Sequence, residues 1–131
     1  MIRLRAIVVD DSRAMRLILR RIVGQLGFDV IEAEDGQAAL AALAEADEVP
    51  DLALVDWNMP NMNGLEFITA VRADARLREM TLVMFTTESE QSQIVRALAA
   101  GAHEYVIKPF TSGAMVEKLA LLGLVPSGAT T

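Results

Sequence analysis

The sequence predicts an α/β protein that forms a single domain around a parallel sheet, with five strands alternating with five helices. Two observations carry this prediction. Short apolar runs, each the length of a buried strand, alternate with longer segments whose apolar residues recur at helical spacing. Four of the five runs also end in polar residues that could serve a site. Such an alternation implies a doubly wound sheet with right-handed crossovers.

Composition narrows the class of protein. The chain has 131 residues, 53% of them hydrophobic, which suffices for one sizeable core. The formal net charge of −6 disfavours nucleic acid and anionic membranes as partners. The absence of cysteine excludes disulfides and thiolate metal sites. We see no signal peptide and no run as long as a membrane span, so we expect a cytoplasmic protein.

The first expected strand covers residues 4–9 and ends at Asp10 and Asp11. Ser12 is a plausible N-cap for a helix that ends at Gly27. The apolar residues at helical spacing in that helix are Met15, Ile18, Leu19, Ile22, Val23 and Leu26. Its other face carries Arg13, Arg16, Arg20 and Arg21. A charge run of this kind is usually a solvated surface, although a basic face can also meet an acidic partner.

Residues 29–33 alternate polar and apolar side chains, which predicts an edge strand. Asp35 and Gly36 mark a turn before a second helix with apolar residues between 38 and 46. An edge strand of this kind has one face that is less covered by the rest of the protein.

The central strand is expected at residues 52–55, a wholly apolar run that ends at Asp56. Pro60 and the asparagines around it force a loop, and Gly64 opens the third helix. Residues 73–80 carry charges of both signs and are expected to form a surface loop.

The fourth strand is expected at residues 82–85 and ends in Thr86, Thr87 and Glu88. The helix after it should end at Gly101, and its apolar pattern comprises Ile94, Val95, Leu98 and Ala99. The fifth strand, residues 105–107, ends at Lys108. Thr111 or Ser112 caps the last helix.

The polar residues at the strand ends are expected to meet, because the carboxyl ends of parallel strands face one crevice. Asp10, Asp11 and Asp56 together favour Mg²⁺, which prefers oxygen ligands. Thr86 and Lys108 would add a hydroxyl and a positive charge, the groups that hold a phosphoryl group. A carboxylate can itself form an aspartyl phosphate, and Asp56 on the central strand is the best candidate for that role.

These motifs resemble the receiver domains of two-component response regulators, especially the stand-alone chemotaxis regulators of the CheY type. The resemblance covers residues 4–122 and leaves 123–131 as a loose tail. It is carried by the strand-one ending VDD, the segment DWNMPNMNG from Asp56 to Gly64, Thr86, and the segment YVIKPF that begins at Tyr105. It implies a flavodoxin-like strand order 2-1-3-4-5 and a cis bond before Pro109.

The resemblance also implies a role for each matching residue. Asp56 would accept the phosphoryl group from a histidine kinase. Asp11 and Asp56 would be direct Mg²⁺ ligands, Asp10 would act partly through water, and Asn58 would contribute its backbone carbonyl. Lys108 would pair with the phosphoryl oxygens.

Further residues match positions that act after phosphorylation. Thr86 and Tyr105 match a coupled switch pair. Asn58 and Glu88 match a pair that tunes spontaneous loss of the phosphoryl group, and the bulk of Thr87 crowds the same approach.

The implied function is a signalling domain and not an enzyme on other substrates, since it catalyses only its own phosphorylation and dephosphorylation. Phosphorylation would switch the surface of helix four, strand five and helix five to bind a target protein, such as a flagellar motor switch protein. We expect a monomer whose partners are a histidine kinase and that target. No nucleic acid or membrane is expected to take part.

Other readings stay open at this point. The chain can be a phosphorelay shuttle that acts with a histidine phosphotransfer protein, or a receiver-like adaptor that does not phosphorylate. It can also be a phosphatase resembling the haloacid dehalogenase superfamily, which uses an aspartate nucleophile. That superfamily places its nucleophile on the first strand in an Asp-x-Asp pattern. Here the first strand ends in Asp10 and Asp11, which weakens the phosphatase reading.

Overall fold

A computed structural model describes residues 4–87 and 91–124. Its sheet has five parallel strands in the order β2-β1-β3-β4-β5, which confirms the predicted fold class and order. The strands are β1 (Arg5–Val9), β2 (Asp29–Ala33), β3 (Leu52–Asp56), β4 (Thr81–Thr87) and β5 (Glu104–Lys108). β2 is the predicted edge strand and β3 is the centre. Glu88 and most of the expected tail lie outside the described residues.

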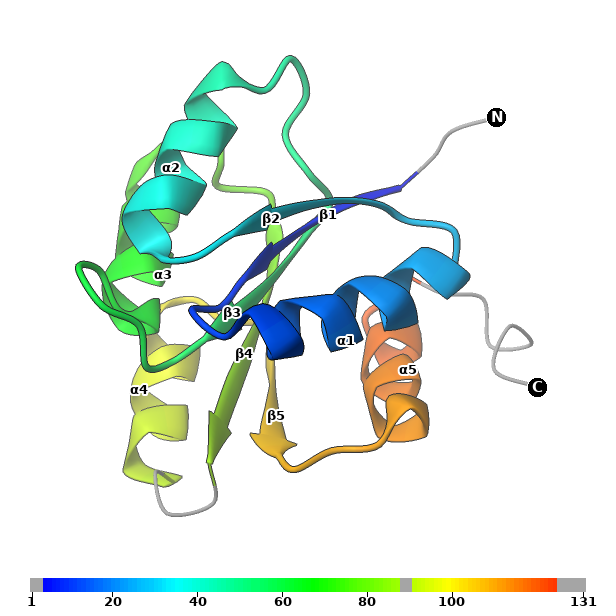
Figure 1. Cartoon of the computed structure of the whole chain (residues 1–131). Coiled ribbons are helices and arrows are strands. Elements are labelled where there is room, and N and C mark those ends of the chain that lie inside the picture. The colour runs from blue at the N-terminus through cyan, green and yellow to red at the C-terminus, as the bar shows by residue number, and fades with distance from the viewer. Residues whose placement is uncertain (1–3, 88–90, 125–131) are drawn as a thin grey trace.

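Five helices cover the two faces of the sheet. They are α1 (Arg13–Gln25), α2 (Gly36–Glu45), α3 (Gly64–Ala73), α4 (Gln91–Ala100) and α5 (Ser112–Leu121). Helices α1 and α5 lie on one face, and α2, α3 and α4 lie on the other (Figure 1). Successive strand residues point to opposite faces, so Leu54 packs in the α1/α5 core and Val55 in the core under α2, α3 and α4. Among the described residues no helix is long and apolar enough to cross a membrane.

Side-chain caps start α1, α2, α3 and α5. The Ser12 hydroxyl accepts a hydrogen bond from Met15 N–H at 3.2 Å, and Thr111 caps α5 in the same way. The predicted turn at Asp35 and Gly36 is instead the start of α2, because Asp35 accepts from Ala38 N–H at 2.7 Å. Each cap fixes the point where the chain leaves the carboxyl end of a strand.

Two helices bury narrower stripes than their apolar patterns predicted. In α1 Leu19 and Val23 are buried, and Met15 and Ile22 pack against the same core, whereas Ile18 is 47% exposed. In α4 the buried residues are Ile94 and Ala97, and Val95 is 69% exposed. A helix on the outside of a sheet contacts it along one narrow stripe, so apolar residues beside that stripe remain in solvent. Ile18 and Val95 fit the helical spacing of their apolar patterns and yet do not belong to the core.

The connection from α3 to β4 is only partly a surface loop. Residues 74–80 form neither helix nor strand, as predicted, but Leu77 and Met80 are 3% and 2% exposed. Both side chains belong to the hydrophobic core between the sheet and helices α2, α3 and α4. The charged residues between them had obscured this pair in the sequence.

Arg72, in the last turn of α3, links this helix to the end of α4 and to the residue before β5. Its guanidinium donates to the carbonyls of Gly101 and Met80, and it also donates to His103 Nδ1 at 3.1 Å. Leu82 N–H donates to the same nitrogen at 3.1 Å, so Nδ1 must be unprotonated. Partial burial and then the charge of Arg72 lower the pKa of His103. His103 is exposed and directly precedes β5, at the end of that strand opposite Lys108.

We expect Gly64→Ala to lower the free energy of unfolding by about 1–3 kcal/mol, because close packing leaves no room for the new methyl group. A Cβ at this position would lie 2.7 Å from the Asp56 carbonyl oxygen and 3.0 Å from Trp57 Cα. Backbone atoms cannot move aside as a flexible side chain can. Urea denaturation of the metal-free protein measures the change.

Gly24→Ala is the matched control. Nothing lies within 4 Å of a Cβ built there, in helix α1. That variant should be unchanged or more stable by about 0.5 kcal/mol, because alanine favours a helix over glycine. Equal stability of the two variants would contradict the tight contact at Gly64.

Candidate functional site

Three carboxylates meet at the carboxyl ends of β1 and β3. Oxygens of Asp10, Asp11 and Asp56 all lie within 4.8 Å of one another. Asp10 and Asp56 are 1% and 8% exposed, whereas Asp11 is in solvent. The adjacent strands β1 and β3 place Asp10 and Asp56 at the same edge of the sheet, as the sequence predicted.

Lys108 brings a positive charge from β5 to this cluster. Its Nζ donates to Asp56 Oδ1 at 2.9 Å and lies 3.5 Å from Asp10 Oδ2. Burial alone would lower the pKa of Lys108, but the hydrogen bond and the charge of Asp56 outweigh it and raise that pKa. The peptide bond between Lys108 and Pro109 is cis, as the resemblance implied. The ammonium group stays charged beside the acids.

Burial raises the pKa of Asp56 above its ordinary value of 3.8. The hydrogen bond from Lys108 works in the opposite direction, and the negative charges of Asp10 and Asp11 add to the rise. The net direction is upward because desolvation is the largest of these effects. Asp56 is therefore a carboxylate with incomplete charge compensation, which favours the arrival of a cation.

The neighbours of Asp10 fix its orientation. Its Oδ1 accepts from Ser12 N–H at 2.9 Å, and its backbone carbonyl accepts from Arg16 Nη1 at 2.8 Å. The guanidinium of Arg16 also pairs with Glu32 on β2 at 3.2 Å. Asp10 Oδ2 is buried with no hydrogen-bond partner among the described residues. Apart from its ion pair with Lys108, this oxygen is available to accept a hydrogen bond from water or to bind a metal ion.

The loop after β3 borders the cluster on its solvent side. A hollow of about 500 Å³ is lined by Asp11, Asn58, Met59, Pro60 and Asn63. Asn58 is exposed at its rim. The side of Asp11 that faces away from the sheet is thus open to a ligand from solvent.

The predicted hydroxyl and the predicted switch residue lie on β4 and β5. Thr86 is 2% exposed, and Thr87 beside it is exposed. Tyr105 is half-buried and is the partner of Met84 in the β4–β5 register. Thr86 is two residues beyond Met84, so alternation puts Thr86 and Tyr105 on the same face of the sheet. The Lys118 ammonium lies 4.8 Å from the centre of the Tyr105 ring.

The donor set suits a hard divalent cation. All three converging groups are carboxylates, and Mg²⁺ prefers oxygen ligands while keeping several waters. Asp10 Oδ2, buried without a hydrogen-bond partner among the described residues, and the exposed Asp11 beside the hollow both fit such an ion. A phosphoryl group arriving from solvent would meet Asp56 and Lys108 together.

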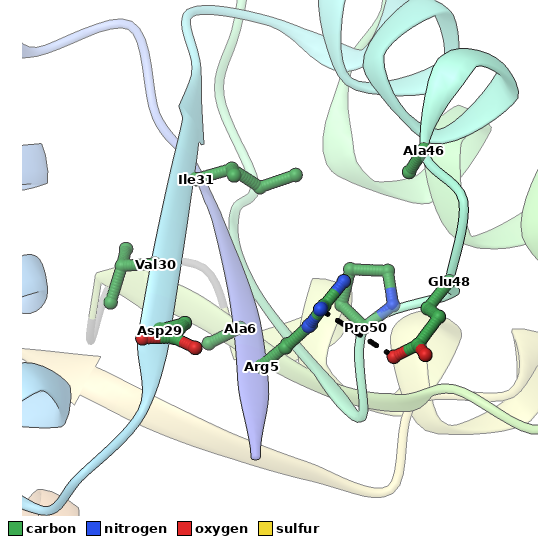
Figure 2. Close-up of a pocket in the computed structure, with 8 residues that line it drawn as sticks. All are labelled: Arg5, Ala6, Asp29, Val30, Ile31, Ala46, Glu48 and Pro50. Atoms are coloured by element: carbon green, nitrogen blue, oxygen red, sulfur yellow. Dashed lines mark ion pairs between the residues drawn. The ribbon is translucent and has the colours of Figure 1, made fainter. Parts of the chain in front are cut away.

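A second hollow lies at the opposite ends of the strands. It has a volume of about 300 Å³, and Figure 2 shows the ion pair between Arg5 and Glu48 beside it, with a separation of 3.6 Å. Its wall includes the apolar side chains of Ile31 and Pro50. This hollow is separate from the carboxylate cluster and takes no part in the site.

Sequence reasoning missed residues that support the site. Arg16 was assigned to a solvated face, yet it binds the Asp10 backbone. Asp35 was assigned to a turn, yet it is 6% exposed and accepts from Asn61 Nδ2 at 2.8 Å. An Asp-Gly pair directly before an apolar helical pattern is a recognised helix start, so that part of the Asp35 role could have been found. Its contact with Asn61 leaves no local signal.

A comparison with protein families decides the class. A family model described as the response regulator receiver domain matches residues 6–120. The chain belongs to this receiver domain family. The chemotaxis protein CheY1 of Helicobacter pylori is 42% identical over 117 residues, which cover 88% of this chain and 94% of the relative. The chemotaxis protein CheY of Pseudomonas aeruginosa is 40% identical, with 88% and 93% covered.

Solved receiver structures share the fold. Chemotaxis response regulator CheY4 of Vibrio cholerae matches with a TM-score of 0.84 and 30% identity, over 92% of this chain and 99% of that one. The receiver domain of a sensor histidine kinase from Pseudomonas aeruginosa matches with a TM-score of 0.80 and 22% identity, over 92% and 97%. That structure has a magnesium ion coordinated in its active-site cleft. At such low identity the second likeness concerns the fold alone.

We expect Lys108→Met to lower the unfolding free energy of this receiver domain by about 2 kcal/mol at pH 7 without metal. This value lies between those of exposed and buried ion pairs, because the Lys108 side chain is 22% exposed. The loss should shrink between pH 7 and pH 4. The reason is that loss of the Lys108 charge raises the pKa of Asp56 further, so the folded variant takes up a proton at higher pH than the parent and thereby neutralises its unpaired carboxylate.

Urea denaturation of both proteins across that pH range makes the measurement. Lys118→Met is the matched control, since its ion pair with Glu104 at 3.2 Å lies outside the carboxylate cluster. The control should show a smaller loss that does not depend on Asp56. A loss for Lys108→Met that grows as the pH falls would contradict the assignment.

Proposed function

We propose that this receiver domain is a phosphorylation-activated chemotaxis response regulator that accepts a phosphoryl group on Asp56. The observation that carries the proposal is the position of Asp56. Its carboxylate lies within 4.8 Å of two other acids and 2.9 Å from the Lys108 ammonium, at the carboxyl end of β3. A nucleophile, a cation site and a positive charge for phosphoryl oxygens are thereby present together.

Asp10, Asp11, Asp56 and the backbone carbonyl of Asn58 would hold Mg²⁺. The bound ion would supply positive charge against the oxygens of the phosphoryl group. An Asp56 carboxylate oxygen attacks phosphorus, and the phosphorus–nitrogen bond to the phosphohistidine of a kinase breaks. The imidazole leaves with the electron pair of that bond and takes a proton. Lys108 then exchanges its contact with Asp56 for one with a phosphoryl oxygen.

Loss of the phosphoryl group follows by hydrolysis. Water attacks phosphorus, the phosphorus–oxygen bond to Asp56 breaks, and inorganic phosphate is released. Asn58 and Thr87 are both exposed next to the cluster, where they can set the approach of that water. Glu88, which lies outside the described residues, is proposed to act with them.

The output would be a change on α4, β5 and α5. The Thr86 hydroxyl is proposed to donate to a phosphoryl oxygen, which requires it to move toward the site. Tyr105 lies on the same face of the sheet and can take up the space that Thr86 leaves. A hollow of about 430 Å³ lined by Tyr105, Pro109, Phe110 and Lys118, among others, offers a docking site on this surface.

The partners proposed are a histidine kinase and a flagellar motor switch protein. The relatives named as chemotaxis proteins, at about 40% identity over most of the chain, support this choice over the alternatives. A phosphorelay shuttle is not favoured, because these relatives are named as chemotaxis proteins, and an aspartate-nucleophile phosphatase is not favoured, because the chain belongs to the receiver family. The phosphatase reading also requires the nucleophile on the first strand, whereas Asp56 ends the third.

Treatment with acetyl phosphate and Mg²⁺ should add one phosphoryl group to Asp56. Intact-mass spectrometry with peptide mapping makes the measurement. Asp56→Asn should remain unmodified, and a chelator should abolish the reaction in the parent. Asp47→Asn, which alters an exposed acid outside the cluster, is the matched control and should react like the parent. Modification of another residue, or of Asp56 without metal, would contradict the proposal.

Thr86→Ala should still bind beryllofluoride, a phosphoryl mimic, but should lose most of the affinity that the mimic adds for the motor switch protein. We expect that gain to fall about tenfold, because the link from the site to Tyr105 is gone. Calorimetric titration with the motor switch protein of the same organism measures it. Tyr105→Ala tests the other end of the link. An undiminished gain in both variants would show that the signal takes another route.

A further inference from the structure

The loop between β3 and α3, residues 57–63, directly follows the proposed phosphoacceptor Asp56. It contains Asn58, whose backbone carbonyl is a proposed metal ligand. Its two ends are fixed by backbone hydrogen bonds. Trp57 N–H donates to the Phe85 carbonyl at 2.9 Å, and Gly64 N–H donates to the Trp57 carbonyl at 3.0 Å. Between these points the chain leaves the sheet, so the position of Asn58 depends on what holds the tip of the loop.

The tip contacts the start of α2 through a side-chain pair. Asn61 Nδ2 donates to Asp35 Oδ2 at 2.8 Å. A longer backbone hydrogen bond, 3.4 Å from Gly36 N–H to the Met62 carbonyl, lies next to it. Asn61 has a φ of +65°, a left-handed conformation that asparagine adopts more readily than most residues. The backbone at Asn61 thus turns its side chain toward Asp35.

Asp35 is a rigid attachment point. It is 6% exposed, and its Oδ1 caps α2 by accepting from Ala38 N–H at 2.7 Å. These two donors, Ala38 first and Asn61 second, lower its pKa, so it is ionised at neutral pH. The segment before it is joined to the metal cluster, because Asp10 N–H donates to the Ala33 carbonyl at 3.1 Å. Asp35 therefore belongs to the same framework as the carboxylates.

We propose that the Asn61–Asp35 hydrogen bond is a positioning contact that holds the Asn58 carbonyl in place for the metal ion and thereby sets the affinity for Mg²⁺. Neither residue touches the proposed ion. The inference rests on the proposed magnesium site and adds a pair of positioning residues to it. Outer contacts that orient a ligand change metal affinity by about tenfold or more in other sites.

Trp57 provides the readout. It is the only tryptophan in the sequence, it is 4% exposed, and it directly follows Asp56. Its fluorescence during a titration with Mg²⁺ alone reports binding, and calorimetry checks the dissociation constant. Thermal melting without metal establishes that each variant is folded.

Asn61→Gly removes the donor but keeps a residue that accepts positive φ without cost. We expect its Mg²⁺ dissociation constant to rise about tenfold while its melting temperature stays close to that of the parent. The double variant Asp35→Asn with Asn61→Asp exchanges donor and acceptor and keeps the net charge. Asparagine caps a helix as well as aspartate does, so α2 retains its cap. The double variant should bind Mg²⁺ within about twofold of the parent.

The outcomes separate this inference from the proposed function. A parent that binds no Mg²⁺ would overturn the proposed metal site and this inference together. A parent that binds, with Asn61→Gly binding equally well, would overturn only the positioning role. A double variant as weak as Asn61→Gly would also overturn it, because restoring the hydrogen bond would then have restored nothing.

Discussion

The burial of two carboxylates beside one ammonium group is the constraint on which the site depends. Asp10 and Asp56 are nearly out of solvent, and an unpaired buried carboxylate costs several kcal/mol. Lys108 offsets part of this cost, yet the pKa of Asp56 remains above its ordinary value. The folded protein therefore holds excess negative charge at this edge of the sheet. A bound cation would relieve that excess, and metal binding at this site would then be linked to the stability of the fold.

The parallel sheet makes this arrangement possible. The three groups come from β1, β3 and β5, which are far apart in the chain, and the backbone ladder fixes their spacing before any side chain interacts. Helices lie on both faces of the sheet (Figure 1), and the central strand β3 is buried throughout, whereas Asp11, just beyond the carboxyl end of β1, is exposed. Around this frame, Arg16 orients Asp10, and Asp35 holds the next loop. The charged groups of the site thus lie at the ends of strands or directly beyond them.

The sequence predicted most of the fold because buried parallel strands are apolar on both faces. The edge strand at 29–33 was found with its observed bounds, and the expected strand at 82–85 proved longer, reaching Thr87. Backbone pairing continues through residues with polar side chains, so a hydropathy pattern does not show where such a strand ends. Contacts between distant loops were also missed, such as Asp35 with Asn61 and Arg72 with Gly101, because they leave no periodic pattern. Sequence motifs identified the carboxylates of the site, whereas the residues that hold them in position were identified only from the structure.

The anchoring of α4 at one end has a mechanical consequence. Arg72 on α3 binds the carbonyl of Gly101 through two nitrogens, at 3.0 and 2.6 Å, directly after the last residue of the helix. With 10 residues, α4 is a rod of about 15 Å with a pivot at its C-terminal end. A displacement of about 1 Å at the other end, next to β4, would tilt the rod by about 4° instead of sliding it. The exposed side chains of Val95 and Leu98 would then sweep through arcs of different length, larger for Val95 because it lies farther from the pivot.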